Sequence, residues 1–189
     1  MIVVAPLAGL LLGFLDFVWI KYVPFPLGGL GNSMAVWAVA AFLVTRRSRW
    51  NLPASVIGAV MMLVVAVPAY YLAAALIQND ELSQAYASYA LIWMALGVVA
   101  GGIFGAGGYL ARVPGRLQRV AVALPGSVLF AEAAIELLRA GDPSYGVAEP
   151  LMLAAILIAL GVVVSRRALL FTIPLAVLGF VVFSLTGFR

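Results

Sequence analysis

The sequence predicts an all-α integral membrane protein, a polytopic bundle of about seven transmembrane helices that forms one domain over residues 1–189. Hydrophobic residues occupy 66% of the 189 positions and charged residues only 10%, whereas an ordinary soluble domain has about 45–50% apolar and about 25% charged residues. The mean hydropathy of +1.17 leaves little polar sequence for more than short connections. We therefore expect the chain to lie in a lipid bilayer, without a separate soluble domain.

Long apolar runs mark the spans in chain order. They cover residues 2–20, 27–44, 52–77, 89–110, 120–138, 150–164 and 168–188. The first run lacks a basic residue before it and a small-residue cleavage motif after it, so we expect it to stay as a membrane helix and not to be a cleaved signal. The sixth run is the shortest, which leaves six complete spans as the alternative.

The segment after the first run, residues 21–33, extends into the second run and contains two prolines and three glycines. A tight turn on the outer side is the preferred interpretation. The alternative is an irregular or re-entrant segment that leads into the outer part of the bundle.

The basic residues predict the orientation, because Lys and Arg in short loops are retained on the cytoplasmic side. Eight of the eleven fall in the loops after the second, fourth and sixth runs: Arg46, Arg47, Arg49, Arg112, Arg116, Arg119, Arg166 and Arg167. This places the N-terminus inside and all seven acidic residues in the outer half. We expect the protein to reside in the bacterial cytoplasmic (plasma) membrane.

Three acidic residues lie within spans, where an ionisable group is costly unless it faces the bundle interior or a wet cavity. Asp16 lies in the first span, and Glu132 and Glu136 are four residues apart on one face of the fifth. A rise of about 1.5 Å per residue brings these carboxylates and the Asn32 amide to one level of the outer leaflet. We predict an outward-facing acidic pocket between the first, second and fifth spans.

Aromatic residues gather near the same boundary, and most are expected to anchor the protein at the membrane surface. Tyr70 and Trp93 are the two that we expect to line the pocket, where aromatic faces beside a carboxylate favour an organic cation. The alternative for the acids is a structural role, with Glu136 paired to Arg139 and Asp16 near Lys21 at the headgroup level.

Two stripes of small residues recur at intervals of four, a spacing that lets helices approach closely. The stripes are Ala5, Gly9 and Gly13, continued by Asp16, and Gly97, Gly101 and Gly105. Because of this continuation, Asp16 should face protein and not lipid. Packing within the bundle is the ordinary interpretation of the stripes, and contact with a partner membrane subunit is the alternative.

The composition removes several classes of chemistry. The chain has no cysteine and no histidine, which excludes disulfides, thiolate or imidazole metal sites and nucleophile–base pairs that use these residues. No strand–glycine loop–helix pattern supports a nucleotide site, and no nucleic acid partner, cofactor or metal is expected. An enzyme is the least favoured class, although an acid and a base at Glu132 and Glu136 remain formally open.

Four segments carry a resemblance to a known family: LGNSMAVWAVAAFL (residues 30–43), AVPAYYLAA (66–74), the glycine run from Trp93 to Gly108, and AEAAIELL followed by SYGVAEP. They resemble an uncharacterised family of small bacterial multi-pass membrane proteins. The resemblance draws attention to Asn32, Ser33, Trp37, Tyr70, Glu132, Tyr145 and Glu149, and it implies no substrate.

A looser likeness is to the substrate-capturing membrane subunits of energy-coupling-factor vitamin transporters. The stripe from Ala5 to Gly13 looks like the surface that those subunits use against their coupling partner. Those subunits usually have six helices with both termini inside, whereas seven spans are predicted here.

Two functions follow as hypotheses. The first is a small transporter or transporter subunit whose outer pocket binds a cationic or polar organic solute through Asp16, Asn32 and Glu132. The second is a non-transporting membrane scaffold or partner subunit of a larger complex, which would leave a glycine face exposed.

Overall fold

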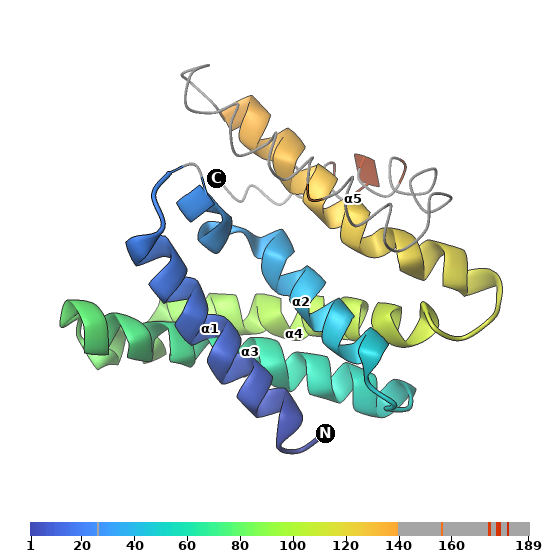
Figure 1. Cartoon of the computed structure of the whole chain (residues 1–189), viewed down its shortest axis with the longest axis horizontal. Coiled ribbons are helices and arrows are strands. Elements are labelled where there is room, and N and C mark those ends of the chain that lie inside the picture. The colour runs from blue at the N-terminus through green and yellow to red at the C-terminus, as the bar shows by residue number, and fades with distance from the viewer. Residues whose placement is uncertain (26, 140–155, 157–173, 175–176, 179–180, 182–189) are drawn as a thin grey trace.

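The computed structural model describes residues 1–25, 27–139, 156, 174, 177–178 and 181. Its elements in this part are five α-helices and two short 3₁₀ helices (Figure 1): α1 Val4–Tyr22, η1 Leu27–Asn32, α2 Met34–Arg47, α3 Leu52–Gln78, η2 Leu82–Tyr86, α4 Ser88–Leu110 and α5 Arg116–Arg139. Of these, α1, α3, α4 and α5 are long and apolar enough to cross a membrane. The all-helical membrane class is confirmed to this extent, and the sixth and seventh predicted spans lie outside the described residues.

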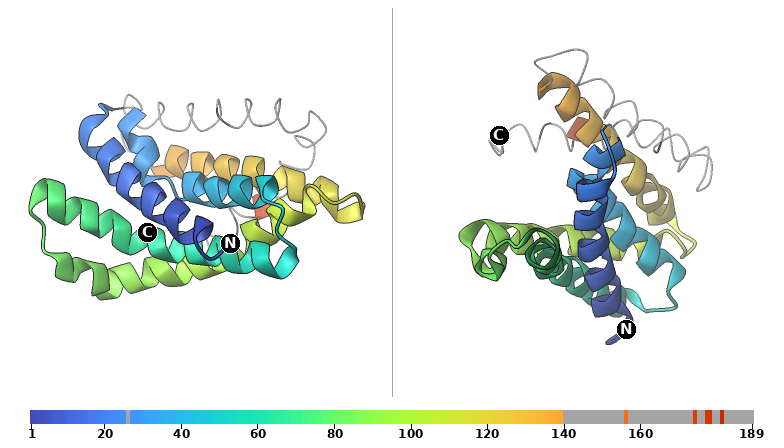
Figure 2. Two further views of the ribbon diagram at one scale, coloured as in Figure 1. Left: turned by 60° about the horizontal axis from the view of Figure 1, so that its bottom comes forward. Right: turned by 60° about the vertical axis from the view of Figure 1, so that its left-hand side comes forward.

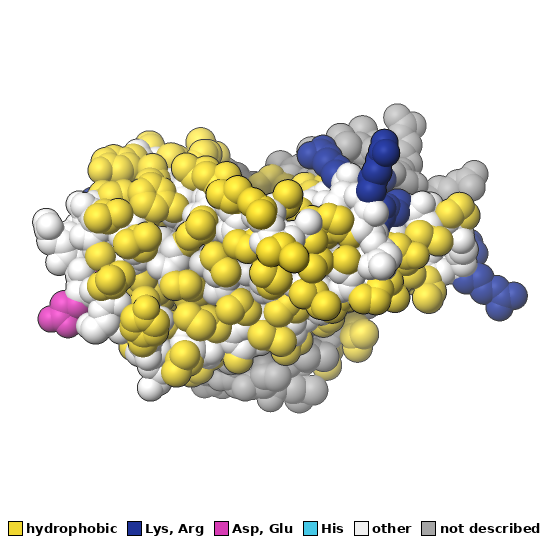
Figure 3. All heavy atoms as spheres, turned by 90° about the horizontal axis from the view of Figure 1, so that it is seen from below, with side chains coloured by type: hydrophobic (Ala, Val, Ile, Leu, Met, Phe, Trp, Pro, Cys, Tyr) yellow, Lys and Arg dark blue, Asp and Glu magenta, His cyan; other side chains and the backbone are white. Residues whose placement is uncertain are grey.

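Successive helices run in opposite directions, so their connections alternate between two ends of the bundle (Figure 1). Both α1 and α4 pack against α3, while α2 packs on α4 and lies between it and α5 (Figures 1 and 2). Most of the visible Lys and Arg side chains lie toward one end, and the visible acidic patch lies at the other (Figure 3). The described part therefore has a basic and an acidic end.

Glycines bring α1 close to α3. A methyl group at Gly9 would overlap the Met62 carbonyl oxygen, and one at Gly13 would overlap the Ala66 carbonyl oxygen. Ala5 is fully buried on the same face of α1. The stripe of small residues in α1 thus serves close packing within this chain, because only glycine leaves room for the neighbouring backbone.

The second stripe, in α4, also faces α3. A methyl group at Gly101 would lie 2.6 Å from the Val60 Cα atom, and one at Gly105 would lie 2.7 Å from the Ser55 carbonyl oxygen. One turn further on, Gly108 lies against α2, where a methyl group would come 2.6 Å from the Phe42 carbonyl oxygen. Glycines therefore set both the α3–α4 and the α2–α4 approach.

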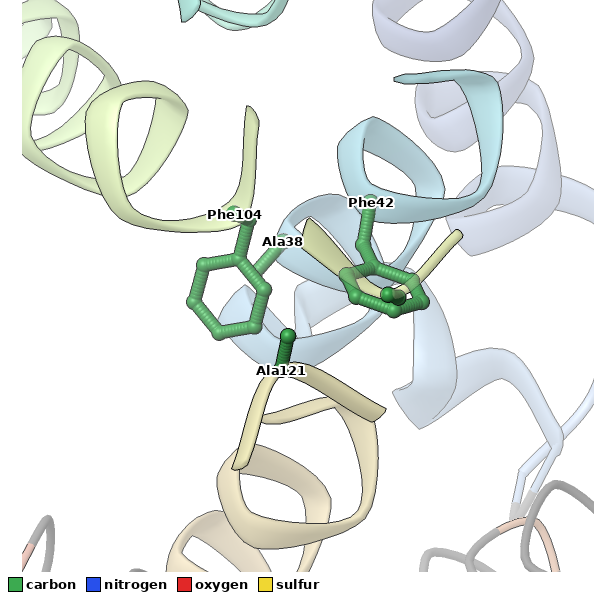
Figure 4. Packing of buried hydrophobic residues seen from close by; sticks show 5 residues of the cluster. Ala38, Phe42, Phe104 and Ala121 are labelled. Atoms are coloured by element: carbon green, nitrogen blue, oxygen red, sulfur yellow. The ribbon is translucent and has the colours of Figure 1, made fainter. Parts of the chain in front are cut away.

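A small apolar core joins α2, α4 and α5. Phe42 of α2 and Phe104 of α4 pack with Ala38 and Ala121, which face them from α2 and α5 (Figure 4). Large apolar side chains also cover the outside of the bundle, where yellow dominates the face seen in Figure 3. An apolar exterior around helices of spanning length fits a lipid environment.

The second predicted span differs from the observed structure. The apolar run of residues 27–44 was expected to form one helix, but η1 occupies its first part and α2 begins only at Met34. With 14 residues, α2 is about 21 Å long, shorter than the about 30 Å of a bilayer's hydrocarbon core. The run contains a helix start in its middle, which hydropathy alone does not reveal.

Candidate functional site

The 3₁₀ helix η1 lies along the last turns of α1. The Trp19 indole donates a hydrogen bond of 2.8 Å to the Leu27 carbonyl oxygen. At the other end of η1, Gly31 lies against the Ile20 side chain, and a methyl group there would be 3.3 Å from the Asp16 carbonyl oxygen. The segment before α2 is therefore irregular and returns alongside α1. The tight outer turn that the sequence favoured for residues 21–33 is not what the structure has. As a result, α2 begins near the level of Asp16.

The start of α2 is completed by the carboxylate of Glu132 on α5. The backbone N–H groups of Met34 and Ala35 donate to Glu132 Oε1 and Oε2 at 3.0 and 2.7 Å. Ser33 Oγ donates to Oε2 at 2.8 Å and accepts a hydrogen bond of 3.2 Å from the Val36 N–H. One carboxylate and one hydroxyl thus satisfy three amide groups that have no partner within their own helix.

This arrangement is electrostatically favourable for both partners. The first amides of a helix lack internal acceptors and carry about half a positive charge, so an anion stabilises a helix N-terminus. In an apolar setting, unpaired N–H groups and an unpaired carboxylate would each be costly. Around Glu132, Leu129 and Ala133 of α5 pack against Ala35 of α2. The carboxylate therefore lies within the contact between α2 and α5.

Asp16 lies in a second polar group, between α1, α2 and α3. Its side chain is 9% exposed, and it lies about 9 Å from the C-terminal end of α1. The Trp37 side chain of α2 lies close enough to interact with it, and the indole N–H is the only donor that Trp offers. The prediction that Asp16 faces protein is confirmed.

A series of aromatic ring contacts begins at Phe17, the residue after Asp16 in α1. The Tyr70 ring packs edge-on against Phe17, with centroids 5.3 Å apart, and Tyr71 packs edge-on against Tyr70 at 5.5 Å. On α4, Trp93 forms a similar pair with Tyr89 at 5.8 Å. Tyr70 lies near enough to Asp16 for the two groups to interact electrostatically. Tyr70 is thus a neighbour of Asp16, whereas the contact found for Trp93 is with Tyr89.

The structure therefore divides the predicted pocket into two groups. Asp16 and Tyr70 come together with Trp37, and Glu132 binds the α2 N-terminus. The side chains of Asn32 and Glu136 lie outside the described part of the structure. Among the described residues, no three acidic side chains are grouped so that they could hold a metal ion.

Two residues of the site, Ser33 and Trp37, were not among the predicted binding residues. Ser33 had a recognisable signal, because serine is a preferred residue immediately before a helix. For Trp37, the signal was the family resemblance, which drew attention to it without giving it a role. A tryptophan in an apolar run is as compatible with lipid contact as with a polar partner.

The basic end has its own polar contact. The Arg112 guanidinium donates through Nη2 to the Trp50 carbonyl oxygen, and it lies 5.1 Å from the centre of the Tyr109 ring. The Trp50 ring in turn covers Gly58 at the start of α3. Arg112 therefore connects the α2–α3 loop to the end of α4, which fits a structural role.

The described elements form an all-helical bundle with four helices long and apolar enough to cross a membrane, a late start of α2 and two carboxylates within the bundle. The chain belongs to a family of unknown function, DUF6518, whose model matches residues 1–189. No curated protein and no solved structure matches it.

Proposed function

We propose that this protein is a small membrane transporter or transporter subunit that binds a cationic or polar organic solute at Asp16. The observation that carries the proposal is a carboxylate that is 9% exposed within an apolar helix of spanning length. Such groups are costly in a membrane, and they typically mark solute, ion or proton pathways. A purely structural acid would be better placed at the headgroup level, where water is available.

The neighbours of Asp16 fit a cationic ligand. A carboxylate supplies the opposite charge, and the nearby side chains of Tyr70 and Trp37 supply aromatic rings, a residue type whose faces attract ammonium groups. The Trp37 side chain already lies beside Asp16. A solute with a positive charge and an apolar body would therefore find complementary groups from three helices.

The proposed orientation has the N-terminus in the cytoplasm. Support comes from six arginines at the basic end of the described part, namely Arg46, Arg47, Arg49, Arg112, Arg116 and Arg119. Basic loops are retained inside, so Asp16, in the half of α1 nearer the acidic end, would be approached from outside. We retain seven spans and a bacterial cytoplasmic membrane as parts of this proposal.

Glu132, which the sequence placed among the solute-binding residues, has a different role in this proposal. All three of its described partners are groups at the start of α2, so the carboxylate acts as an acceptor for this helix and not as a first ligand of the solute. A scaffold function is less favoured, because its expected mark was an exposed glycine face. Most of both glycine stripes is covered by α3.

The test is a thermal-shift screen of the purified protein in detergent. Ammonium, tetramethylammonium and choline are compared with sodium at matched ionic strength. We expect at least one organic cation to raise the unfolding temperature, because a ligand that binds only the folded state stabilises it. The shift should disappear in Asp16→Asn and persist in Asp80→Asn, in which an exposed acid is changed. Equal shifts in both variants would rule out Asp16 as the site.

Transport is tested separately in proteoliposomes that contain the purified protein. A cation that stabilises the protein in the screen should enter these vesicles faster than protein-free vesicles, and Asp16→Asn should remove the difference. Stabilisation without any flux would indicate a capture subunit that needs a partner for transport.

A further inference from the structure

One helical turn, residues 33–37 at the start of α2, contacts both carboxylates of the site. Ser33 and the amides of Met34 and Ala35 donate hydrogen bonds to Glu132, and the Trp37 side chain, four positions after Ser33, lies beside Asp16. The two acids come from different helices, α1 and α5. Among the contacts described for the two acids, this turn of α2 is the one that they share.

The turn can hold its shape only while its amides are satisfied. Three of its N–H groups have no acceptor inside α2; two bind Glu132, and the Val36 N–H binds Ser33 Oγ, which Glu132 itself holds. Without the carboxylate, these donors would lie unpaired among Leu129, Ala133 and other apolar neighbours. Fraying or reorientation of the turn would then release the Trp37 side chain from its position.

We propose that Glu132 is a positioning residue for Asp16: it fixes the first turn of α2, and that turn presents the Trp37 indole to the Asp16 carboxylate. The consequence for solute binding rests on the function proposed above, whereas the coupling between the two carboxylates does not. Because coupling between sites is reciprocal, a ligand that displaces Trp37 from Asp16 should also weaken the hold of Glu132 on α2.

The experiment uses the full-length protein with 5-fluorotryptophan at its four tryptophans and records fluorine NMR spectra. The Trp37 signal is assigned by Trp37→Phe. Asp16→Asn should move this signal, which shows that it reports on the contact with Asp16. Glu132→Gln retains the size of the side chain but replaces one acceptor oxygen by an NH₂ group, so it weakens the cap with little loss of packing.

We expect Glu132→Gln to shift or broaden the Trp37 signal while Trp50, at the basic end, stays in place. Asp16→Asn should then move the Trp37 signal at least twofold less in the Glu132→Gln background than in the wild type. Glu81→Gln, which changes an exposed acid, should alter neither result. Glu132→Asp, which restores a carboxylate, should return part of the wild-type response.

The proposal is overturned if Glu132→Gln leaves the Trp37 signal and its response to Asp16→Asn unchanged. It is equally overturned if Trp50 changes as much as Trp37, because the effect would then be a general loss of structure. No solute is present in this measurement, so a failed thermal-shift screen would count against the proposed function and leave the coupling standing.

Discussion

Ser33 and Glu132 are 99 positions apart in the chain, yet Ser33 Oγ lies 2.8 Å from Glu132 Oε2 and donates a hydrogen bond to it. The serine is the capping residue of α2, and it also accepts from the Val36 N–H. A local cap and a long-range carboxylate therefore act together at one helix end. Discontinuous membrane helices commonly direct such ends toward anionic groups, and here the anion comes from α5.

Replacement of Glu132 by alanine should destabilise the protein strongly. The change leaves two backbone amides and the Ser33 hydroxyl without their acceptor, at a cost of about 3 kcal/mol. Reversible unfolding in detergent measures the loss. Glu132→Gln should fall between alanine and the wild type, and Glu81→Ala, at an exposed site, should change stability by less than about 0.5 kcal/mol. A stability of Glu132→Ala within that margin would contradict the structural role.

Substitutions at Ser33 should follow an order that ordinary capping preferences do not predict. Ser33→Ala removes a cap and should cost about 1 kcal/mol. Aspartate is as good a cap as serine in most helices, but here it would place a second carboxylate against Glu132. Ser33→Asp should therefore be less stable than Ser33→Ala, and adding Glu132→Gln should recover part of the loss. Equal or greater stability of Ser33→Asp would show that the two side chains are not in contact.

The glycines of α1 should not tolerate even a methyl group. Gly13→Ala would drive Cβ into the Ala66 carbonyl oxygen, and overpacking of this kind costs about 1–3 kcal/mol. Gly102→Ala on α4 is the matched control, because no atom lies within 4 Å of its Cβ position and alanine favours the helix. Thermal unfolding should show a lower midpoint for Gly13→Ala and an equal or higher one for Gly102→Ala. The reverse order would refute the close α1–α3 approach.

The orientation can be tested with single cysteines, since the chain has none of its own. Gly115 lies at the basic end with open space around it, and Ser83 is exposed at the acidic end. In intact cells, a membrane-impermeant maleimide should label Ser83→Cys, and it should label Gly115→Cys only after permeabilisation. Labelling of Gly115→Cys from outside would invert the proposed topology.

The sequence predicted the long helices well because each is a continuous apolar run with polar residues at its ends. The expected run of residues 52–77 and the observed α3, Leu52–Gln78, differ by one residue. The stripe of Ala5, Gly9 and Gly13 also predicted correctly that Asp16 faces protein. Helix ends and buried helix faces can be predicted from the spacing and type of residues, because both are local properties of the chain.

The interruption before α2 was harder to predict, because Leu27, Gly28 and Leu30 are as apolar as a membrane helix requires. Ser33, a residue typical of the position before a helix, was the available indication of a helix start. The role of this helix start in the site depends on Glu132, which is distant in the sequence. Glu132 was recognised as important, but its partners are backbone N–H groups. Every residue except proline carries such a group, so no side-chain pattern points to those two.

The separation of Ser33 and Glu132 along the chain also restricts the order of assembly. Synthesis proceeds from the N-terminus, so the α2 segment leaves the ribosome long before its carboxylate exists. Until α5 has been made and has inserted, the first turn of α2 must stay frayed, bind water or lie near the membrane surface, where its amides remain hydrated. The first turn of α2 should therefore form late in biogenesis. In a chain truncated before Glu132, this segment should not insert stably into the bilayer.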